Sequence, residues 1–279
     1  MTAQGLMRRY SYTFAGATLA GIIFAALTFA IGSGVHHLLW MNAMKDHRVP
    51  PLWMEGGVVL LVVAFLTLAS RVAAGALRCR HRQRTMAARL APLLRPLPDH
   101  QTVELLPTAD WHLVADPDAY YAFTWGTGRP QIAVSEALWN TLEPRARQSV
   151  LYHEVAHALA RDPLQQCLLQ VLAEAFPPVG FRQLYERYLT HRELVADAFA
   201  IGACAGDEVP LLTALQTMLS SSIAPTSQVG LAGALRARLQ VLDTHQWPAW
   251  ADAALRYRLM TAATGILLTL GEGVWVICR

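Results

Sequence analysis

Charged residues are scarce in this sequence of 279 residues, and their scarcity is the first guide to its class. Aspartate, glutamate, lysine and arginine make up 15% of the chain, whereas hydrophobic residues make up 54%. An average soluble protein carries about 25% charged residues, so the composition favours a membrane protein. The net charge of +3 is too small for a nucleic-acid-binding surface, and we expect no nucleic-acid partner.

The cysteines lack a CxxC pair, so no disulfide framework can be read from their spacing. We expect all of them to be small hydrophobic residues in a reducing compartment. They are Cys79, Cys167, Cys204 and Cys278.

Long apolar blocks take up much of the remaining sequence, although the second of them carries Glu55 and Arg71 toward its ends. A spanning helix needs about 20 apolar residues, and residues 12–34 and 52–77 both qualify. The alternative for the first block is a cleavable signal peptide, whose apolar core is usually shorter, about 7–15 residues. The block 259–278 is interrupted by Glu272. It is either a last span or a helix that lies in the membrane or in a protein core.

Arginines cluster directly after the second block. The positive-inside rule then places the N-terminus and everything after Leu77 in the cytoplasm. We therefore expect two spans and a basic cytoplasmic flank in residues 1–84, a cytoplasmic domain in 85–250 and a C-terminal span in 251–279. The protein would be a multi-pass protein of a bacterial-type inner (plasma) membrane, in contact with lipid. The arginines are Arg78, Arg80, Arg82, Arg84 and Arg89.

The middle of the chain mixes short strand patterns with longer helical ones. Strands are expected within 102–107, 111–116, 119–126 and 131–135, and helices within 136–142, 144–161 and 181–203, followed by two amphipathic helices. The apolar stretch 164–181 is broken by Pro177 and Pro178, which favours a buried or membrane-dipping helix. The predicted fold is mainly α-helical with a small β-sheet.

The stretch LYHEVAHAL places His153, Glu154 and His157 in an apolar helical run. Residues four apart on a helix share a face, so the two imidazoles can occupy two positions of a tetrahedral zinc ion. Glu154 lies about 100° further round the helix, where it can reach a water bound to the metal and act as general base.

A catalytic zinc needs a third protein ligand, and THRELVADAFA offers one. Glu193 and Asp197 are four residues apart on one helix face. Glu193 is the predicted third ligand, with His191 as the alternative. Asp197 is predicted to orient a ligand imidazole through its second nitrogen. Asp162 either orients a ligand in the same way or only ends the helix.

The oxyanion that forms on the attacked carbonyl also needs a donor. The candidates are His191, Tyr188 and Arg192, and the sequence does not choose among them.

The segment GRPQIAVSEALWNTLEPRARQSVLYHEVAHALARDP resembles the zinc domain of the BlaR/MecR-type antirepressor membrane metallopeptidases. RELVADAFA is also similar to the prenyl-protease and heat-shock membrane protease group. Together these likenesses cover about residues 116–203. They imply a gluzincin domain attached to transmembrane helices, with one Zn²⁺ held by His153, His157 and Glu193, and with Glu154 as general base.

The resemblance also implies an edge strand to which a peptide substrate could add. This strand consists of Gln131, Ile132, Ala133, Val134 and Ser135. The sequence departs from the antibiotic-sensing members, because no large sensor domain follows the last apolar block. A partner protein would then supply the signal, or the protease acts without one.

The predicted function is that of a zinc endopeptidase that cleaves a protein substrate at the cytoplasmic membrane face, in signalling through a repressor or precursor. Two alternatives stay open. One is a membrane quality-control or maturation protease, and the other is a catalytically silent membrane scaffold.

Overall fold

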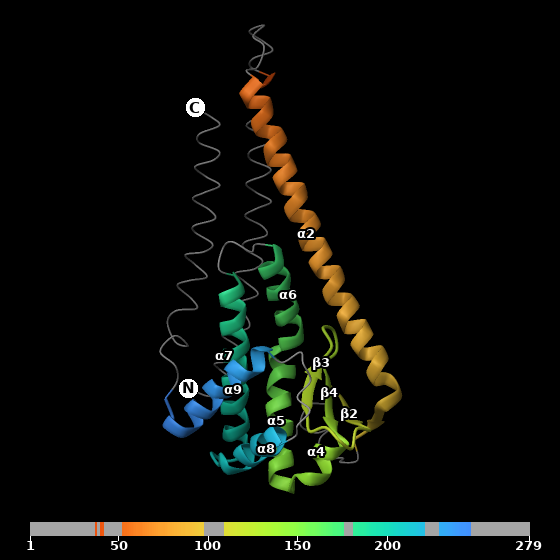
Figure 1. Cartoon of the computed structure of the whole chain (residues 1–279), viewed down its shortest axis with the longest axis vertical. Coiled ribbons are helices and arrows are strands. Elements are labelled where there is room, and N and C mark those ends of the chain that lie inside the picture. Colours follow the sequence, from red (N-terminus) through yellow and green to blue (C-terminus); the bar gives the residue numbers. More distant parts are fainter. Residues whose placement is uncertain are drawn as a thin grey trace.

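The described part of the chain is a helical domain with one small sheet, joined to a long helix (Figure 1). A computed structural model describes residues 37, 40–41, 52–97, 109–175, 181–220 and 229–246. Its helices are α2 (Leu52–Leu90), the 3₁₀ turn η1 (Ala91–Leu93), α4 (Glu136–Thr141), α5 (Pro144–Ala160), α6 (Asp162–Ala175), α7 (Phe181–Ala203), α8 (Val209–Ser220) and α9 (Val229–Thr244). Its strands are β1 (Leu94–Pro96), β2 (Asp110–Val114), β3 (Ala122–Trp125) and β4 (Gln131–Ser135). A mainly helical domain with a small sheet was predicted, and this is confirmed.

The sheet is mixed, with the strand order β1-β2-β4-β3. Strand β4 runs parallel to β2 and antiparallel to β3. The prediction that Gln131–Ser135 forms an edge is therefore wrong, because β3 covers its open side. The chain returns from β3 to β4 through Gly126, whose φ of 94° is a backbone conformation that glycine adopts without strain.

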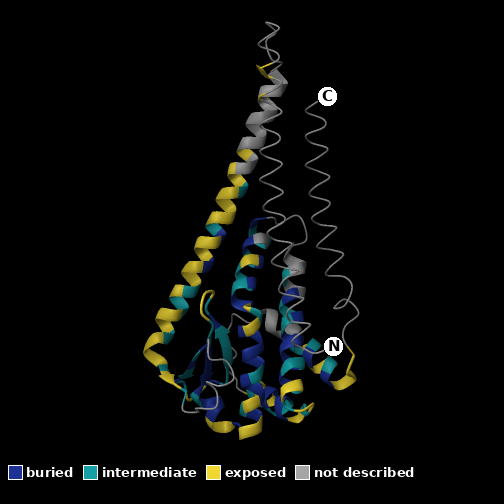
Figure 2. Cartoon of the chain, turned by 180° about the vertical axis from the view of Figure 1, so that it is seen from behind, coloured by how far each residue is buried: buried dark blue, intermediate teal, exposed yellow. Residues whose placement is uncertain are grey.

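Helix α5 lies at the centre of the domain and is largely buried (Figure 2). It begins with Pro144 at its first position, where the missing N–H costs nothing. It ends at Arg161, which takes the left-handed conformation (φ 53°), and Asp162 then starts α6. The predicted helix over 144–161 and its end before Pro163 are confirmed, as are the later helices α7, α8 and α9.

The main hydrophobic core joins the sheet to the inner side of α5. It is formed by side chains of β2, β4, α4, α5 and α8, among them Trp111, Ile132, Leu138, Val155 and Ala214. This packing fixes the position of α5 along its axis and its rotation about that axis, and so determines where its polar residues point.

Helices α2 and α6 are fastened to each other by a disulfide between Cys79 and Cys167. Near it, Arg78 and Glu174 form an ion pair of 2.6 Å, and Gly75 packs against Val171. The prediction that these two cysteines are free is wrong. Because 88 residues separate them in sequence, their spacing carried no sign of the pairing.

Helix α2 runs along one side of the domain and extends beyond it (Figure 1). Its N-terminal part contains the predicted second span, residues 52–77. The predicted spans 12–34 and 259–278 and the predicted strand at 102–107 lie outside the described residues. Among the described residues, no helix has the length and apolar character required to cross a membrane.

Candidate metal and active site

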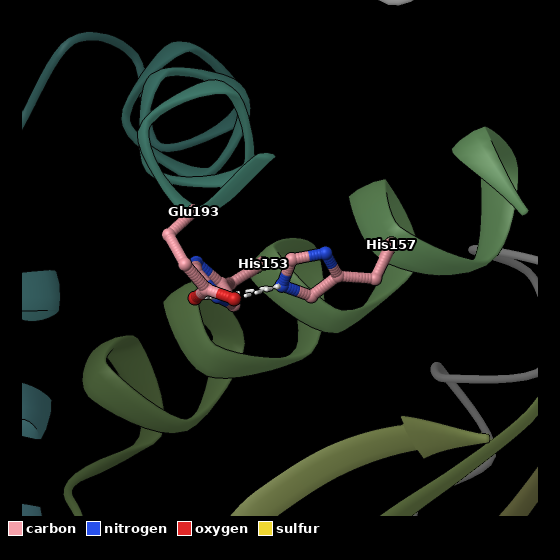
Figure 3. Close-up of side chains that lie close together, drawn as sticks. All are labelled: His153, His157 and Glu193. Carbon is pink, nitrogen blue, oxygen red and sulfur yellow. Dashed lines mark hydrogen bonds and ion pairs between the residues drawn. The ribbon is translucent and has the colours of Figure 1, made fainter. Parts of the chain in front are cut away.

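Three side chains from two helices meet at the centre of the domain. His153 and His157 of α5 point toward Glu193 of α7 (Figure 3). The two Nε2 atoms of the imidazoles lie 3.1 Å apart. The Glu193 carboxylate oxygens lie 3.4 Å from Nε2 of His153 and 3.7 Å from Nε2 of His157. All three side chains are buried.

These distances fit a zinc ion. Zinc–nitrogen and zinc–carboxylate bonds are about 2.0–2.2 Å long, so two tetrahedral ligand atoms lie about 3.4 Å apart. The three ligand atoms all lie within 4.8 Å of one another. Two imidazoles and one carboxylate are also a usual donor set of catalytic zinc, in which the fourth position stays open. The predicted third ligand is therefore where a metal needs it.

A carboxylate stands beside the outer nitrogen of each histidine. Asp162 Oδ2 lies 2.6 Å from Nδ1 of His157, and Asp197 Oδ1 lies 2.9 Å from Nδ1 of His153. The second contact is at an ion-pair distance and does not form a hydrogen bond. Partners at Nδ1 fix the tautomer in which Nε2 is free to bind a metal, so Asp162 and Asp197 both stand where a ligand-orienting group is needed.

Arg238 of α9 is a member of the site that the sequence did not reveal. Its Nε and Nη2 donate to the two oxygens of Asp197 at 2.7 Å each, and its Nη1 donates to Glu193 at 3.4 Å. Its side chain is 9% exposed. In sequence it is one arginine in an amphipathic helix, and only its burial distinguishes it from an ordinary surface cation.

Burial and neighbouring charge act against each other on the ligand side chains. Burial alone would lower the pKa of His157, but the Glu193 charge and the bond to Asp162 raise it to about 10. The same balance raises the pKa of His153. Burial would raise the pKa of Glu193, but the two imidazoles and Arg192 hold it well below its usual range. Without metal, the negative carboxylates thus favour retention of a proton on the imidazole pair.

Glu154 lies one residue after the first ligand and faces β3. The hydroxyl of Thr124 donates to Oε2 of Glu154 at 2.7 Å and also lies 3.1 Å from the backbone oxygen of Glu154. The Glu154 residue is only 4% exposed. Thr124 was predicted only as part of a strand, since no sequence pattern connects residues 30 apart.

A cavity of about 300 Å³ opens at the metal ligands and the base. One wall is β3 with the residues before it, and the facing wall is the apolar side of α8 with part of α9. The apolar residues of the facing wall are Leu211, Ala214, Leu215, Met218, Leu219 and Leu235. A peptide-sized groove between a strand edge and an apolar helix suits an extended chain with a hydrophobic side chain.

The three predicted oxyanion donors all line a small pocket behind His157, and one of them also lines the cavity. Arg192 lines the cavity, where its Nη1 donates to Gln166 at 2.7 Å. The Tyr188 hydroxyl donates to Asp162 at 3.0 Å. Tyr188 and His191 share the small pocket with Arg192 but do not line the cavity.

The comparisons with known proteins agree with this geometry. Residues 80–177 match the model of peptidase family M48. No curated protein matches the chain. The match includes His153, Glu154 and His157 but ends before Glu193, so the structure adds the third ligand to what the match covers. The chain thus carries a peptidase family M48 domain, and it is a zinc metallopeptidase in which an HExxH helix and one glutamate of a second helix are clustered for a single metal ion.

Proposed function

We propose that the chain is a membrane-associated endopeptidase that cleaves extended segments of protein substrates. The observation that carries this proposal is the convergence of His153, His157 and Glu193 beside the carboxylate of Glu154. The peptidase domain accounts for the chemistry, while the substrate and the membrane setting are inferred.

Glu154 is the general base in this proposal. A bound zinc ion supplies a Lewis acid that lowers the pKa of water and polarises the scissile carbonyl. The Glu154 carboxylate takes a proton from the attacking water and passes it to the leaving amine nitrogen. His153, His157 and Glu193 hold the metal, and Asp162 and Asp197 keep the imidazoles in the orientation required.

The outer edge of β3, which is the last strand of the described sheet, is the proposed docking line for the substrate. Ser135 donates its backbone N–H to Tyr121, and β3 pairs with β4 in the register Ala122↔Val134. Hydrogen-bonded and non-bonded pairs alternate in an antiparallel ladder. The backbone groups of Ala122 and Thr124 therefore face away from β4. A substrate strand can pair with them, as peptides add to other exposed sheet edges.

Arg192 is the proposed oxyanion donor among the three predicted candidates. It lines the cavity, and a guanidinium has five N–H donors, so its bond to Gln166 and its ion pair with Glu193 leave others for a substrate oxygen. Arg238 has its nitrogens turned toward Asp197 and Glu193, which suits it to hold the site together.

Attachment to a membrane is supported by the sequence blocks and by α2. Large apolar side chains of this helix are exposed at Val63, Leu66, Val72 and Leu77. Exposed apolar surface of this extent is typical of contact with lipid or with another helix. We propose that α2 and the apolar blocks 12–34 and 259–278 together hold the peptidase at the membrane.

Two observations bear on the side of the membrane that the domain faces. The arginines after residue 77 favour the cytoplasm, and we keep that orientation. A disulfide such as Cys79–Cys167 persists mainly in oxidising compartments, so a cytoplasmic domain would hold the pair as thiols. Alkylation of cysteines in intact cells, together with a reporter fused near Thr85, tests this. An oxidised pair and an external reporter signal would reverse the orientation.

Purified full-length protein in detergent tests the proposed activity. The zinc-loaded protein should cleave an unfolded protein such as casein, and a zinc chelator should abolish the cleavage. Glu154→Ala should keep about one zinc per chain and lose cleavage. Full cleavage by Glu154→Ala would overturn the proposal.

A comparison of cellular peptide termini between wild type and Glu154→Ala separates a regulatory role from a quality-control role. A regulatory protease would leave one uncleaved substrate in the Glu154→Ala cells, whereas a quality-control protease would leave many.

A further inference from the structure

Thr124 connects the edge strand to the catalytic base, and the HExxH motif gives it no role. Its hydroxyl lies 2.7 Å from Oε2 of Glu154 and donates to it. We propose that Thr124 is the positioning residue of the base: it holds Oε2 of Glu154, so that Oε1 takes the proton from the attacking water. This inference rests on the proposed endopeptidase function.

A single hydrogen bond matters here because the glutamate side chain is otherwise free to turn. The carboxylate is attached through three rotatable bonds, and only some of its rotamers direct an oxygen at the open coordination position. A hydroxyl that donates to Oε2 selects among these rotamers and leaves Oε1 unclaimed. Proton transfer to a base is efficient only when the acceptor lies within hydrogen-bond reach of the proton.

The location of Thr124 adds a second consequence. Its backbone N–H and C=O face the open side of β3, where the substrate strand is proposed to pair, while its side chain holds Glu154. One residue therefore contacts both the substrate backbone and the base, so that docking of the substrate stiffens the strand that aligns the carboxylate.

The chemistry leaves Thr124 unchanged. A proton passes from water to Oε1 of Glu154 and then to the leaving nitrogen, as a C–O bond forms and the C–N bond breaks. The hydroxyl of Thr124 keeps its own proton throughout.

The first test compares Thr124→Val with Thr124→Ser in the zinc-loaded full-length protein. Valine keeps the β-branched shape of the strand residue but removes the hydrogen-bond donor. We expect kcat to fall about tenfold, which is a part of the 10²–10⁴-fold rate acceleration that a general base contributes. KM should stay within about twofold of wild type. Serine keeps the hydroxyl and should restore most of kcat. Thr213→Val, in α8, is the matched control, because the hydroxyl of that threonine donates to the backbone oxygen of Val209 in its own helix.

Readouts other than activity separate positioning from a structural role. Zinc content and thermal midpoint should be the same in wild type and Thr124→Val. In the Glu154→Ala background, addition of Thr124→Val should leave the affinity for an uncleaved casein-derived peptide unchanged and cause no further loss of residual turnover. The inference would be overturned if Thr124→Val had the kcat of wild type, or if Thr124→Ser failed to restore kcat. It would also be overturned if Thr124→Val lowered kcat as much in the Glu154→Ala background as in wild type. Full activity of Glu154→Ala alone would instead contradict the proposed endopeptidase function.

Discussion

The Nδ1 atom of His157 lies 2.6 Å from a carboxylate oxygen of Asp162, and the other oxygen of Asp162 accepts a hydrogen bond from Tyr188. One carboxylate thus connects the last turn of α5, the first residue of α6 and the middle of α7. The sequence left open whether Asp162 orients a ligand or only ends the helix. Asp162 follows Arg161, the C-cap of α5, and its side chain turns back to His157, which favours the orienting role.

Asp162→Asn is expected to weaken zinc binding by about 10–100-fold, the usual cost of losing an outer partner of a metal-bound histidine. An amide cannot accept from His157 with the strength of a carboxylate, so the imidazole loses its fixed tautomer. Competition with a fluorescent zinc chelator measures the change. Asp118→Asn, at an exposed carboxylate, is the control. Equal zinc affinity in both variants would show that Asp162 has no part in orienting the ligand.

Zinc binding is expected to strengthen as the pH rises from about 7 to about 10. The pKa of His157 is raised from 6.5 to about 10 without metal, so at pH 7 zinc must displace a proton from the imidazole cluster. Calorimetric titration in buffers of different ionisation enthalpy should show release of about one proton per zinc at pH 7. Binding without proton release would contradict a protonated cluster.

The same pKa fixes how the stability of the metal-free protein depends on pH. A histidine with a raised folded-state pKa contributes stability that is fully present below pH 6.5 and is lost as the pH rises through about 10. In EDTA, the free energy of unfolding by urea should therefore fall between pH 7 and pH 10. With saturating zinc this fall should be reduced or reversed, because the metal replaces the proton.

Leu219→Gln is expected to raise KM for substrates with a large apolar side chain near the cleaved bond, by a few-fold, and to leave kcat nearly unchanged. Leu219 is 51% exposed and lines the cavity, so its loss removes substrate contact rather than core packing. Leu239→Gln is the matched control, because Leu239 is 39% exposed and does not line the cavity. An equal rise in KM for both variants would show that the α8 wall does not select the substrate.

Peptides with single N-methyl groups test the edge of β3. Methylation removes one N–H donor, so cleavage should be lost at alternate positions, where the peptide would donate to Ala122 or Thr124, and kept at the positions between them. A scan of one cleavable peptide by mass spectrometry gives the pattern. Loss without alternation would exclude strand pairing at this edge.

Reduction of the Cys79–Cys167 bond should lower the free energy of unfolding by about 2–4 kcal/mol, the usual contribution of a disulfide. Because the bond fastens α2 to α6, the double replacement Cys79→Ser and Cys167→Ser should show the same loss without reductant. Cys204→Ser is the control, since Cys204 is a free thiol. Urea unfolding followed by fluorescence measures all of these. An unchanged midpoint on reduction would show that the bond does not support the fold.

Local patterns predicted much of this structure. The helices came from periodicity and from caps such as Pro144, and the ligands His153 and His157 came from spacing within a single helix. Even Glu193 could be predicted, because its acidic partner Asp197 stands one turn away in an apolar helix. These features depend on residues close in sequence.

The remaining features depend on contacts between distant parts of the chain. Arg238 reaches Asp197 across 41 residues, and Thr124 reaches Glu154 across 30. Hydrophobic periodicity does not predict such pairs, because in the local sequence each residue looks like an ordinary member of its helix or strand. The prediction that β4 is an edge strand failed for the same reason, since β4 becomes internal only when β3 folds back on it.

The metal site is formed by segments that are far apart in the sequence. A fragment cut at the end of the family match, residue 177, would retain both histidines and the base but lack the carboxylate of Glu193 and the guanidinium of Arg238. Two imidazoles without the third ligand would bind zinc too weakly to retain it at the concentration of free zinc in a cell. Minimal versions of this peptidase therefore have to include α7 and α9, however well the shorter piece folds.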